Sequence, residues 1–121
     1  MAADRKKLGN EGEDLAAAHL RSRGFRILER NARMGRLGEL DIVAVDGRTL
    51  VFVEVKARRD AAFGPPEEAV TPSKLRTVAS CAEAWRAARG WTDRPYRIDV
   101  VAVAFGSGAP ETRHLEDIRL D

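Results

Sequence analysis

The chain has 121 residues, of which 44% are hydrophobic and 33% are charged. These values are typical of a globular domain, and no apolar run approaches the roughly 20 residues of a membrane span. We therefore expect one domain over residues 1–121, without a signal peptide and with a cytoplasmic location. Cys81 is the one cysteine, which excludes intrachain disulfides and cysteine-based zinc sites.

The basic residues are mostly arginine. The net charge of +2 is too small to establish nucleic-acid binding on its own. Of the 21 basic residues, four are lysines, which leaves 17 arginines. Only Lys56 and Lys74 lie beyond residue 7. In such an arginine-rich chain, a lysine suggests a position that requires a compact, mobile charge.

The first half of the chain predicts one helix followed by three strands. Asn10 is a good N-cap and Gly24 is a good residue to follow the end of a helix, so we expect a helix over Glu11–Arg23. Strands are expected over Gly24–Arg30, Glu39–Val45 and Thr49–Ala57, with a loop over Asn31–Gly38. The Asp46–Gly47 pair between the last two strands is a strong signal for a β-hairpin.

The second half begins with a long loop over Arg58–Val70, after which Thr71 and Pro72 open a helix that ends near Arg89. The remaining strands are expected over Tyr96–Phe105 and, at a sheet edge, over His114–Leu120. A helical crossover between the third and fourth strands should make them parallel. The sequence therefore predicts an α/β fold with a central mixed sheet flanked by helices.

Two charged residues interrupt the apolar third strand near its end. Side chains alternate between the faces of a strand, so Phe52, Glu54 and Lys56 share one face and the valines between them share the other. Both faces begin apolar, which indicates that the strand is covered on both sides. An uncompensated buried carboxylate is costly, so Glu54 must contact a cation, a metal ion or water.

The length of the hairpin loop decides whether Asp41 joins these residues. A two-residue loop of Asp46 and Gly47 puts Asp41 diagonal to Glu54, a four-residue loop puts it directly opposite, and a three-residue loop puts it on the other face. Two carboxylates across a ladder require a counter-charge, from Lys56 or from a hard divalent cation such as magnesium. This set suits metal-assisted phosphodiester hydrolysis, and the alternative is a surface ion pair at a strand end.

The hairpin "GELDIVAVDGRTLVFVEVKAR" (Gly38–Arg58) resembles the core of the PD-(D/E)XK nucleases, which have the restriction-endonuclease-like fold. Within that superfamily, the chain is most similar to the YraN-like family of small bacterial endonuclease-related proteins. The resemblance covers nearly the whole chain, through "GNEGEDLAAAHLRSRGFRILERNAR", "GELDIVA", "VFVEVKARR", "FGPPEEAV" and "YRIDVVAV", with a lysine at the start of the second helix. It implies an αβββαβ core, in agreement with the predicted order of elements.

The resemblance also implies the residues of an active site that uses Mg²⁺ or Mn²⁺. The implied metal ligands are Asp41, Glu54 and the backbone carbonyl of Val55. Lys56 would be the catalytic lysine. Leu40 stands where the superfamily has a proline, a position that varies among its members.

Glu13 has two interpretations. It matches a helix glutamate of the resolvase-like branch of the superfamily, which helps to hold the metal or its waters and would make Glu13 a further catalytic residue. It also lies three residues after Asn10, so it could instead close a capping box at the start of the helix. One carboxylate can combine the two roles.

Five basic residues are candidates for phosphate contacts, and each could equally be a solvated surface residue. Lys74 falls in the first turn of the second helix, where a cation is unfavourable unless an anion binds there. The other four, on loops beside the site, are Arg33, Arg36, Arg58 and Arg59. Asp99 interrupts the fourth strand, and we expect it to be a buried partner of Arg97 or another arginine rather than a support of the site.

The function that we expect is Mg²⁺-dependent hydrolysis of DNA phosphodiester bonds, with branched DNA as one candidate substrate. The alternative is a nucleic-acid-binding protein that keeps the nuclease fold without cleaving. Junction resolvases act as pairs, so a homodimer is expected by analogy.

Overall fold

The computed structural model describes residues 2–59, 64, 68 and 70–119. Two helices and five strands form in these ranges: α1 (Ala2–Ser22), β1 (Arg26–Arg33), β2 (Glu39–Asp46), β3 (Thr49–Arg58), α2 (Pro72–Arg89), β4 (Tyr96–Ala104) and β5 (Glu111–Leu115). The strands form one sheet in the order β1-β2-β3-β4-β5. Only β3 and β4 are parallel, and α2 connects them, as predicted.

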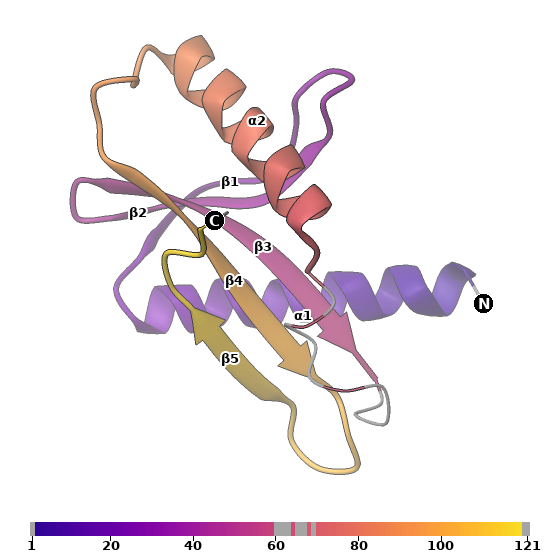
Figure 1. Cartoon of the computed structure of the whole chain (residues 1–121). Helices are drawn as coiled ribbons and strands as arrows, with labels where there is room; N and C mark the ends of the chain where they lie inside the picture. The colour runs from indigo at the N-terminus through magenta and orange to yellow at the C-terminus, as the bar shows by residue number, and fades with distance from the viewer. Residues whose placement is uncertain (1, 60–63, 65–67, 69, 120–121) are drawn as a thin grey trace.

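The mixed α/β fold is confirmed, and its element order is that of a restriction-endonuclease-like core. Figure 1 shows α1 and α2 on opposite faces of the sheet, with the first turns of α1 extending beyond β3. No helix in the described part of the chain is both long enough and apolar enough to cross a bilayer. The predicted loop over Arg58–Val70 falls largely outside the described residues.

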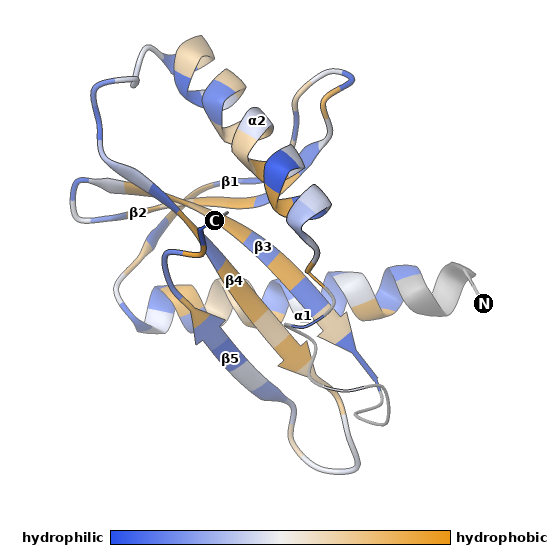
Figure 2. Cartoon of the chain, viewed as in Figure 1, coloured by the Kyte–Doolittle hydropathy of each residue, from blue (hydrophilic) through white to orange (hydrophobic). Residues whose placement is uncertain are grey.

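Two hydrophobic clusters hold the helices on the sheet, one on each face. The α1-side cluster joins Ala16, Ala17, Leu20 and Phe25 to Ile42, Ala44, Val51, Val53, Val101 and Val103. The α2-side cluster joins Leu75, Val78, Cys81, Ala82 and Trp85 to Ala32, Leu40, Val43, Leu50, Phe52, Ile98 and Val100. Because both faces are covered, the central strands β3 and β4 are largely apolar, whereas the edge strand β5 is mainly hydrophilic (Figure 2).

Helix α1 begins at Ala2, so the predicted start at Glu11 is wrong. Asn10 and Glu13 lie well inside the helix, which excludes the capping box proposed for them. The predicted end is confirmed, because Gly24 has a φ of 88° and its N–H bonds the carbonyl of Arg21. The N–H of Phe25 bonds the carbonyl of Leu20, which completes the two-bond pattern of a Schellman motif.

Gly12 allows α1 to approach β3 closely. A Cβ atom added at Gly12 would meet the Cβ of Ala57 at 2.7 Å, nearer than side-chain carbons normally approach. The absence of a side chain therefore sets the distance between the helix and the strand. This contact fixes the height of Glu13, the next residue of α1, above the sheet.

The β2–β3 hairpin has the register in which the two site carboxylates are neighbours. Asp46 pairs with Thr49 and Ile42 pairs with Val53, where the ladder ends, and the same register continued by one residue would bring Asp41 opposite Glu54. This is the register that we expected from a four-residue loop, although the loop contains only Gly47 and Arg48. Gly47 has a φ of 63°, and a glycine in this first loop position is typical of a type II′ turn.

The two edge strands differ from the predictions. β1 extends to Arg33, where it pairs with Glu39, so only the last part of the predicted loop remains as a loop. β5 covers Glu111–Leu115 rather than His114–Leu120, and it lies at the sheet edge as expected. The last residue of the predicted strand lies outside the described residues.

Candidate metal and nucleic-acid site

Asp41 and Glu54 bring their carboxyl groups together at the end of the hairpin. The Oδ2 atom of Asp41 accepts a hydrogen bond of 2.9 Å from the backbone N–H of Val55. Its carboxyl group also lies close enough to that of Glu54 to raise the pKa of Glu54. Glu54 is only 3% exposed, and its Oε2 atom is buried without a hydrogen-bond partner. The site therefore contains a buried carboxylate oxygen without a hydrogen bond, and the Lys74 ammonium group lies 3.5 Å from it.

An irregularity of β2 gives Asp41 this position. Leu40 belongs to the α2-side cluster and Ile42 to the α1-side cluster, although residues two apart in a regular strand share a face. The strand therefore changes its orientation around Asp41. The side chain of Asp41 consequently reaches both the N–H of Val55 and the carboxyl group of Glu54.

The electrostatics of this pair favour an added positive charge. Burial, and then the hydrogen bond and like charge of Asp41, raise the pKa of Glu54 to about 8, against the opposing effect of Lys74 and Lys56. Two carboxyl groups so close together cannot both ionise freely, so the metal-free pair shares one proton near neutral pH and keeps one negative charge, which Lys74 faces. A divalent cation would replace this proton and satisfy both groups.

Lys74 lies at the site, but its ammonium group contacts a protein carboxylate. Its Nζ atom is 3.5 Å from the Oε2 atom of Glu54. Lys56 shares the strand face of Glu54 by alternation, and its charge also lowers the pKa of Glu54. The structure therefore brings together the two lysines that the sequence singled out.

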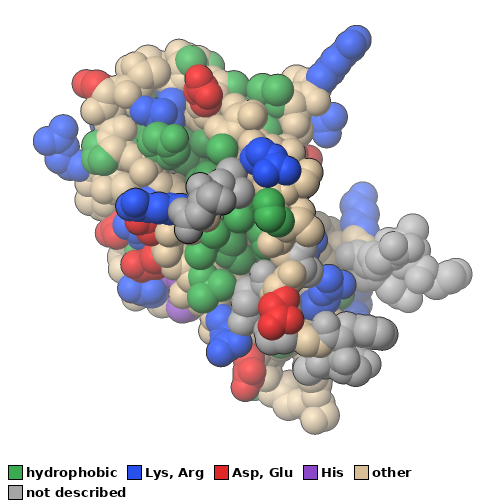
Figure 3. Space-filling view, in the orientation of Figure 1, with side chains coloured by type: hydrophobic (Ala, Val, Ile, Leu, Met, Phe, Trp, Pro, Cys, Tyr) green, Lys and Arg blue, Asp and Glu red, His purple; other side chains and the backbone are tan. Residues whose placement is uncertain are grey.

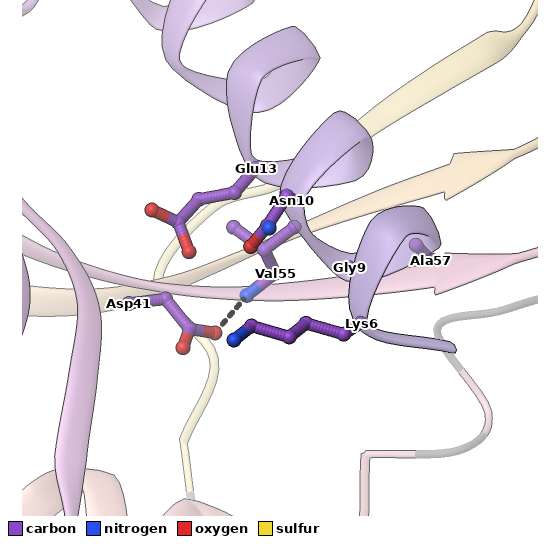
Figure 4. A pocket seen from close by; sticks show the side chains of 7 residues that line it. All are labelled: Lys6, Gly9, Asn10, Glu13, Asp41, Val55 and Ala57. Atoms are coloured by element: carbon purple, nitrogen blue, oxygen red, sulfur yellow. Dashed lines mark hydrogen bonds between the residues drawn. The ribbon is translucent and has the colours of Figure 1, made fainter. Parts of the chain in front are cut away.

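Helix α1 provides the other wall of the site. Glu13 and Asp41 line a cavity of about 270 Å³, together with Lys6, Gly9, Asn10, Val55 and Ala57 (Figure 4). Glu13 is 8% exposed, and its Oε1 atom accepts hydrogen bonds from Arg30 at 2.9 Å and from Asn31 at 3.0 Å. The carboxylate of Glu13 is thus held in place within a cavity that it shares with Asp41.

Lys6 and Asn10 are site-lining residues that the sequence reasoning missed, since the predicted helix began after both. Figure 4 shows the Lys6 side chain pointing toward Asp41. The scarcity of lysine was an available signal, because three of the four lysines in the chain, Lys6, Lys56 and Lys74, surround the carboxylates of the site.

The four candidate arginines lie at the ends of strands or in the adjoining loops. Arg33 ends β1, and its Nε atom donates to the carbonyl of Gly35 at 3.1 Å. Arg36, Arg58 and Arg59 are exposed, and Arg58 ends the strand that carries Glu54. Their positions leave the guanidinium groups available for solvent-side partners beside the site.

The donor set fits a hard divalent cation. Asp41 and Glu54 offer carboxylate oxygens, and the backbone carbonyl of Val55 is a further candidate ligand, as the resemblance implied, while Glu13 lines the cavity beside Asp41 and is held by Arg30 and Asn31. Oxygen ligands, few in number and completed by water, suit Mg²⁺ and Mn²⁺. The unpartnered Oε2 atom of Glu54 is the structural observation that supports this fit.

A second group with metal-like spacing lies around β4. Ligand atoms of Asp99, His114 and Glu116 all lie within 4.8 Å of one another, so these residues could hold a metal ion. However, Arg97 contacts Asp99 at 3.0 Å and Glu116 at 3.8 Å, and His114 contacts Asp99 at 2.8 Å. The carboxylate of Asp99 already has its counter-charge, which confirms the prediction that it pairs with Arg97.

Comparisons with known proteins identify the family of the chain. The model of a family described as "Uncharacterised protein family UPF0102" matches residues 12–103, a range that includes Glu13, Asp41, Glu54, Lys56 and Lys74. A UPF0102 protein of Anaeromyxobacter dehalogenans is 53% identical over 110 residues, which cover 91% of this chain and 81% of that protein. A UPF0102 protein of Geotalea uraniireducens is 47% identical over 116 residues, which cover 95% of this chain and 91% of that protein. The chain therefore belongs to the UPF0102 family, which is the YraN-like family of the restriction-endonuclease-like superfamily.

Proposed function

We propose that the protein is a metal-dependent nuclease that hydrolyses DNA phosphodiester bonds at the Asp41–Glu54 site. The observation that supports this proposal most directly is the close approach of these two carboxyl groups, one of which is buried and has an oxygen without a hydrogen bond. Two neighbouring carboxylates do not help the protein to fold, because like charges on adjacent strands are destabilising. A bound Mg²⁺ or Mn²⁺ would make the pair favourable and would supply Lewis-acid chemistry at a phosphate.

The residues of the site have distinct roles in this proposal. Asp41 and Glu54 bind the metal, with the Val55 carbonyl, and Glu13 orients its waters. Lys56 helps to deprotonate the attacking water and stabilises the negative charge that develops on the phosphate. The contact of Asp41 with the N–H of Val55 and the cavity that Asp41 shares with Glu13 support these assignments.

Nucleic-acid contacts in this proposal are concentrated near the site. On the described part of the face shown in Figure 3, lysine and arginine side chains surround a central hydrophobic area and do not form one continuous band. With a net charge of only +2, long-range attraction of DNA is weak. We assign the contacts to flanking phosphates to Lys74, Arg33, Arg36, Arg58 and Arg59.

Asp41→Ala tests the metal site. The variant should lose metal-dependent cleavage by at least a factor of about 100, because it removes a metal ligand, while circular dichroism shows an unchanged fold. Asp93→Ala is the matched control, since Asp93 is exposed in the turn after α2 and has no role in the site. Cleavage by purified Asp41→Ala at the rate of the wild type would refute the assignment.

A substrate panel separates cleavage from binding alone. Branched, single-stranded and duplex DNA are incubated with Mg²⁺ or Mn²⁺, with the wild type and with Lys56→Ala. We expect the wild type to cleave at least one substrate and Lys56→Ala to bind it without cleaving. Binding without cleavage by both proteins would favour the non-cleaving alternative.

A further inference from the structure

Lys74 and Glu54 form an ion pair between a solvent-exposed side chain and a buried one. The side chain of Lys74 is 44% exposed and that of Glu54 is 3% exposed, with 3.5 Å between Nζ and Oε2. Among the described residues, this oxygen has no hydrogen-bond partner, so the ammonium group is its nearest compensation. Lys74 thus contacts the buried carboxyl group of Glu54 from the solvent-exposed start of α2.

The local structure of α2 does not explain a lysine at this position. Thr71 caps the helix, and its side chain accepts a hydrogen bond of 3.1 Å from the backbone N–H of Lys74. The first turn contains no acidic residue, and a cation there opposes the partial positive charge of the helix N-terminus. The favourable partner of Lys74 is therefore Glu54, which β3 supplies.

A metal ion at Glu54 would compete with Lys74 for the same oxygen. A divalent cation and an ammonium group repel each other at contact distance, and both cannot neutralise one carboxylate. The lysine stem is flexible and nearly half exposed, so its ammonium group can move into solvent without a change of the fold. At the N-terminus of α2, a released ammonium group lies where backbone N–H groups also favour a phosphate.

We propose that Lys74 links metal binding to nucleic-acid binding: it pairs with Glu54 in the metal-free protein, and the metal releases it to contact a phosphate. This inference rests on the proposed function, because it requires a metal at the Asp41–Glu54 site. Since coupling between two ligands is reciprocal, a phosphate that engages Lys74 also strengthens metal binding. DNA and metal therefore favour each other's binding through one side chain.

Mn²⁺ binding without DNA tests the first half of the proposal. Lys74→Met keeps the length of the side chain and removes its charge, and Lys74→Gln is a second neutral variant should the first fold poorly. We expect either variant to bind Mn²⁺ more tightly than the wild type, by roughly fivefold or more, the lower end of typical couplings. Arg76→Met, on the same helix and exposed, removes a cation that does not contact the site and should leave Mn²⁺ affinity unchanged.

DNA binding tests the second half. The affinity for a short labelled DNA duplex is measured with and without Mn²⁺ in a Lys56→Ala background, which prevents cleavage. Mn²⁺ should strengthen DNA binding in this background, and the gain should shrink when Lys74→Met is added. A gain of unchanged size would overturn the proposal, as would a Lys74→Met protein with the Mn²⁺ affinity of the wild type.

Asp41→Ala distinguishes a failure of this inference from a failure of the proposed function. If Mn²⁺ binding is lost in Asp41→Ala but unaffected by Lys74→Met, the metal site at Asp41 and Glu54 is supported and the proposed role of Lys74 is refuted. If Mn²⁺ binding does not depend on Asp41, both proposals fall together.

Discussion

Burial of the Glu54 carboxyl group lowers the stability of the metal-free protein. Its Oε2 atom has no hydrogen bond, and Asp41 adds a second carboxyl group in contact with it. Lys74 offsets this cost only in part, because its side chain is 44% exposed and its ammonium group is 3.5 Å away. At the scale of single residues, the arrangement of Asp41 and Glu54 therefore destabilises the metal-free protein. Such a cost is common at sites where a bound ligand supplies the interaction that the buried group lacks.

Glu54→Gln should stabilise the metal-free protein and abolish its stabilisation by Mn²⁺. The amide removes the like charge and can donate a hydrogen bond to Asp41, so we expect a gain of about 1 kcal/mol in the free energy of unfolding. Urea denaturation in EDTA at pH 8.5, above the raised pKa of about 8 of Glu54, measures this gain.

Glu83→Gln is the control for this change, because Glu83 is an exposed glutamate of α2. It should alter the free energy of unfolding by less than about 0.5 kcal/mol. A Glu54→Gln protein that is less stable than the wild type in EDTA would show that the carboxylate is satisfied without metal.

The central residues of the site could be predicted because strand periodicity is local. Alternation groups Glu54 with Lys56, and the register of a short hairpin brings Asp41 near them, but parity alone does not place the Asp41 side chain because β2 changes its orientation around this residue. The contact of Lys74 with Glu54 depends instead on where α2 packs against β3. That distance follows from tertiary packing of the two elements, which no local pattern in the sequence encodes.

At the scale of elements, the contact of α1 with β3 positions Glu13. Gly12→Ala would place a Cβ atom 2.7 Å from that of Ala57, so α1 must move away from the strand. We expect a loss of about 1–3 kcal/mol in the free energy of unfolding, as in other overpacked contacts. Because Glu13 moves with the helix, Mn²⁺ affinity should fall as well.

Gly9→Ala provides a matched control in the same helix. A Cβ atom at Gly9 would have no neighbour within 4 Å, so the substitution should stabilise the protein by about 0.5–1 kcal/mol through helix propensity. Chemical denaturation and Mn²⁺ titration of both variants test the contact. Equal effects of the two substitutions would contradict a role for the Gly12–Ala57 approach.

The misplaced element boundaries have physical causes. Gly9 and Asn10 argue locally against helix before Glu11, yet α1 begins at Ala2 and uses Gly12 for its contact with β3. The end of β5 depends on Asp117, which has a φ of 54° and donates its N–H to Asp99 at 2.9 Å. This interaction between distant segments stops the strand where the apolar pattern would continue it.

At the scale of the whole molecule, Asp99 joins β4 to β5 and to the C-terminal segment. It is fully buried and accepts hydrogen bonds from Arg97, from His114 and from the N–H of Asp117. Arg23, which follows α1, donates to the Nδ1 atom of His114, so the other ring nitrogen carries the proton that reaches Asp99. The network thus links the end of α1 with two strands on the far side of β3 from Asp41.

Asp99→Asn should be the most destabilising of these substitutions. An amide cannot neutralise Arg97, and its NH₂ group would face donors, so we expect a loss of about 3–5 kcal/mol in the free energy of unfolding.

The size of this loss depends on pH through the pKa of Asp99. Burial alone would raise this pKa, but the hydrogen bonds from His114, Arg97 and Asp117 lower it below its ordinary value of 3.8. A carboxyl group with a lowered pKa stabilises the fold above that ordinary value, and this contribution disappears as the pH falls through the lowered pKa. Measured by urea denaturation, the difference in the free energy of unfolding between the wild type and Asp99→Asn should therefore be largest at neutral pH and should decrease below pH 3.8. The control is Asp117→Asn, which changes an exposed carboxylate of the same segment. Its free energy of unfolding should stay within about 0.5 kcal/mol of that of the wild type. A gap that persists unchanged into the acid range would mean that packing, and not the charge of Asp99, holds these segments together.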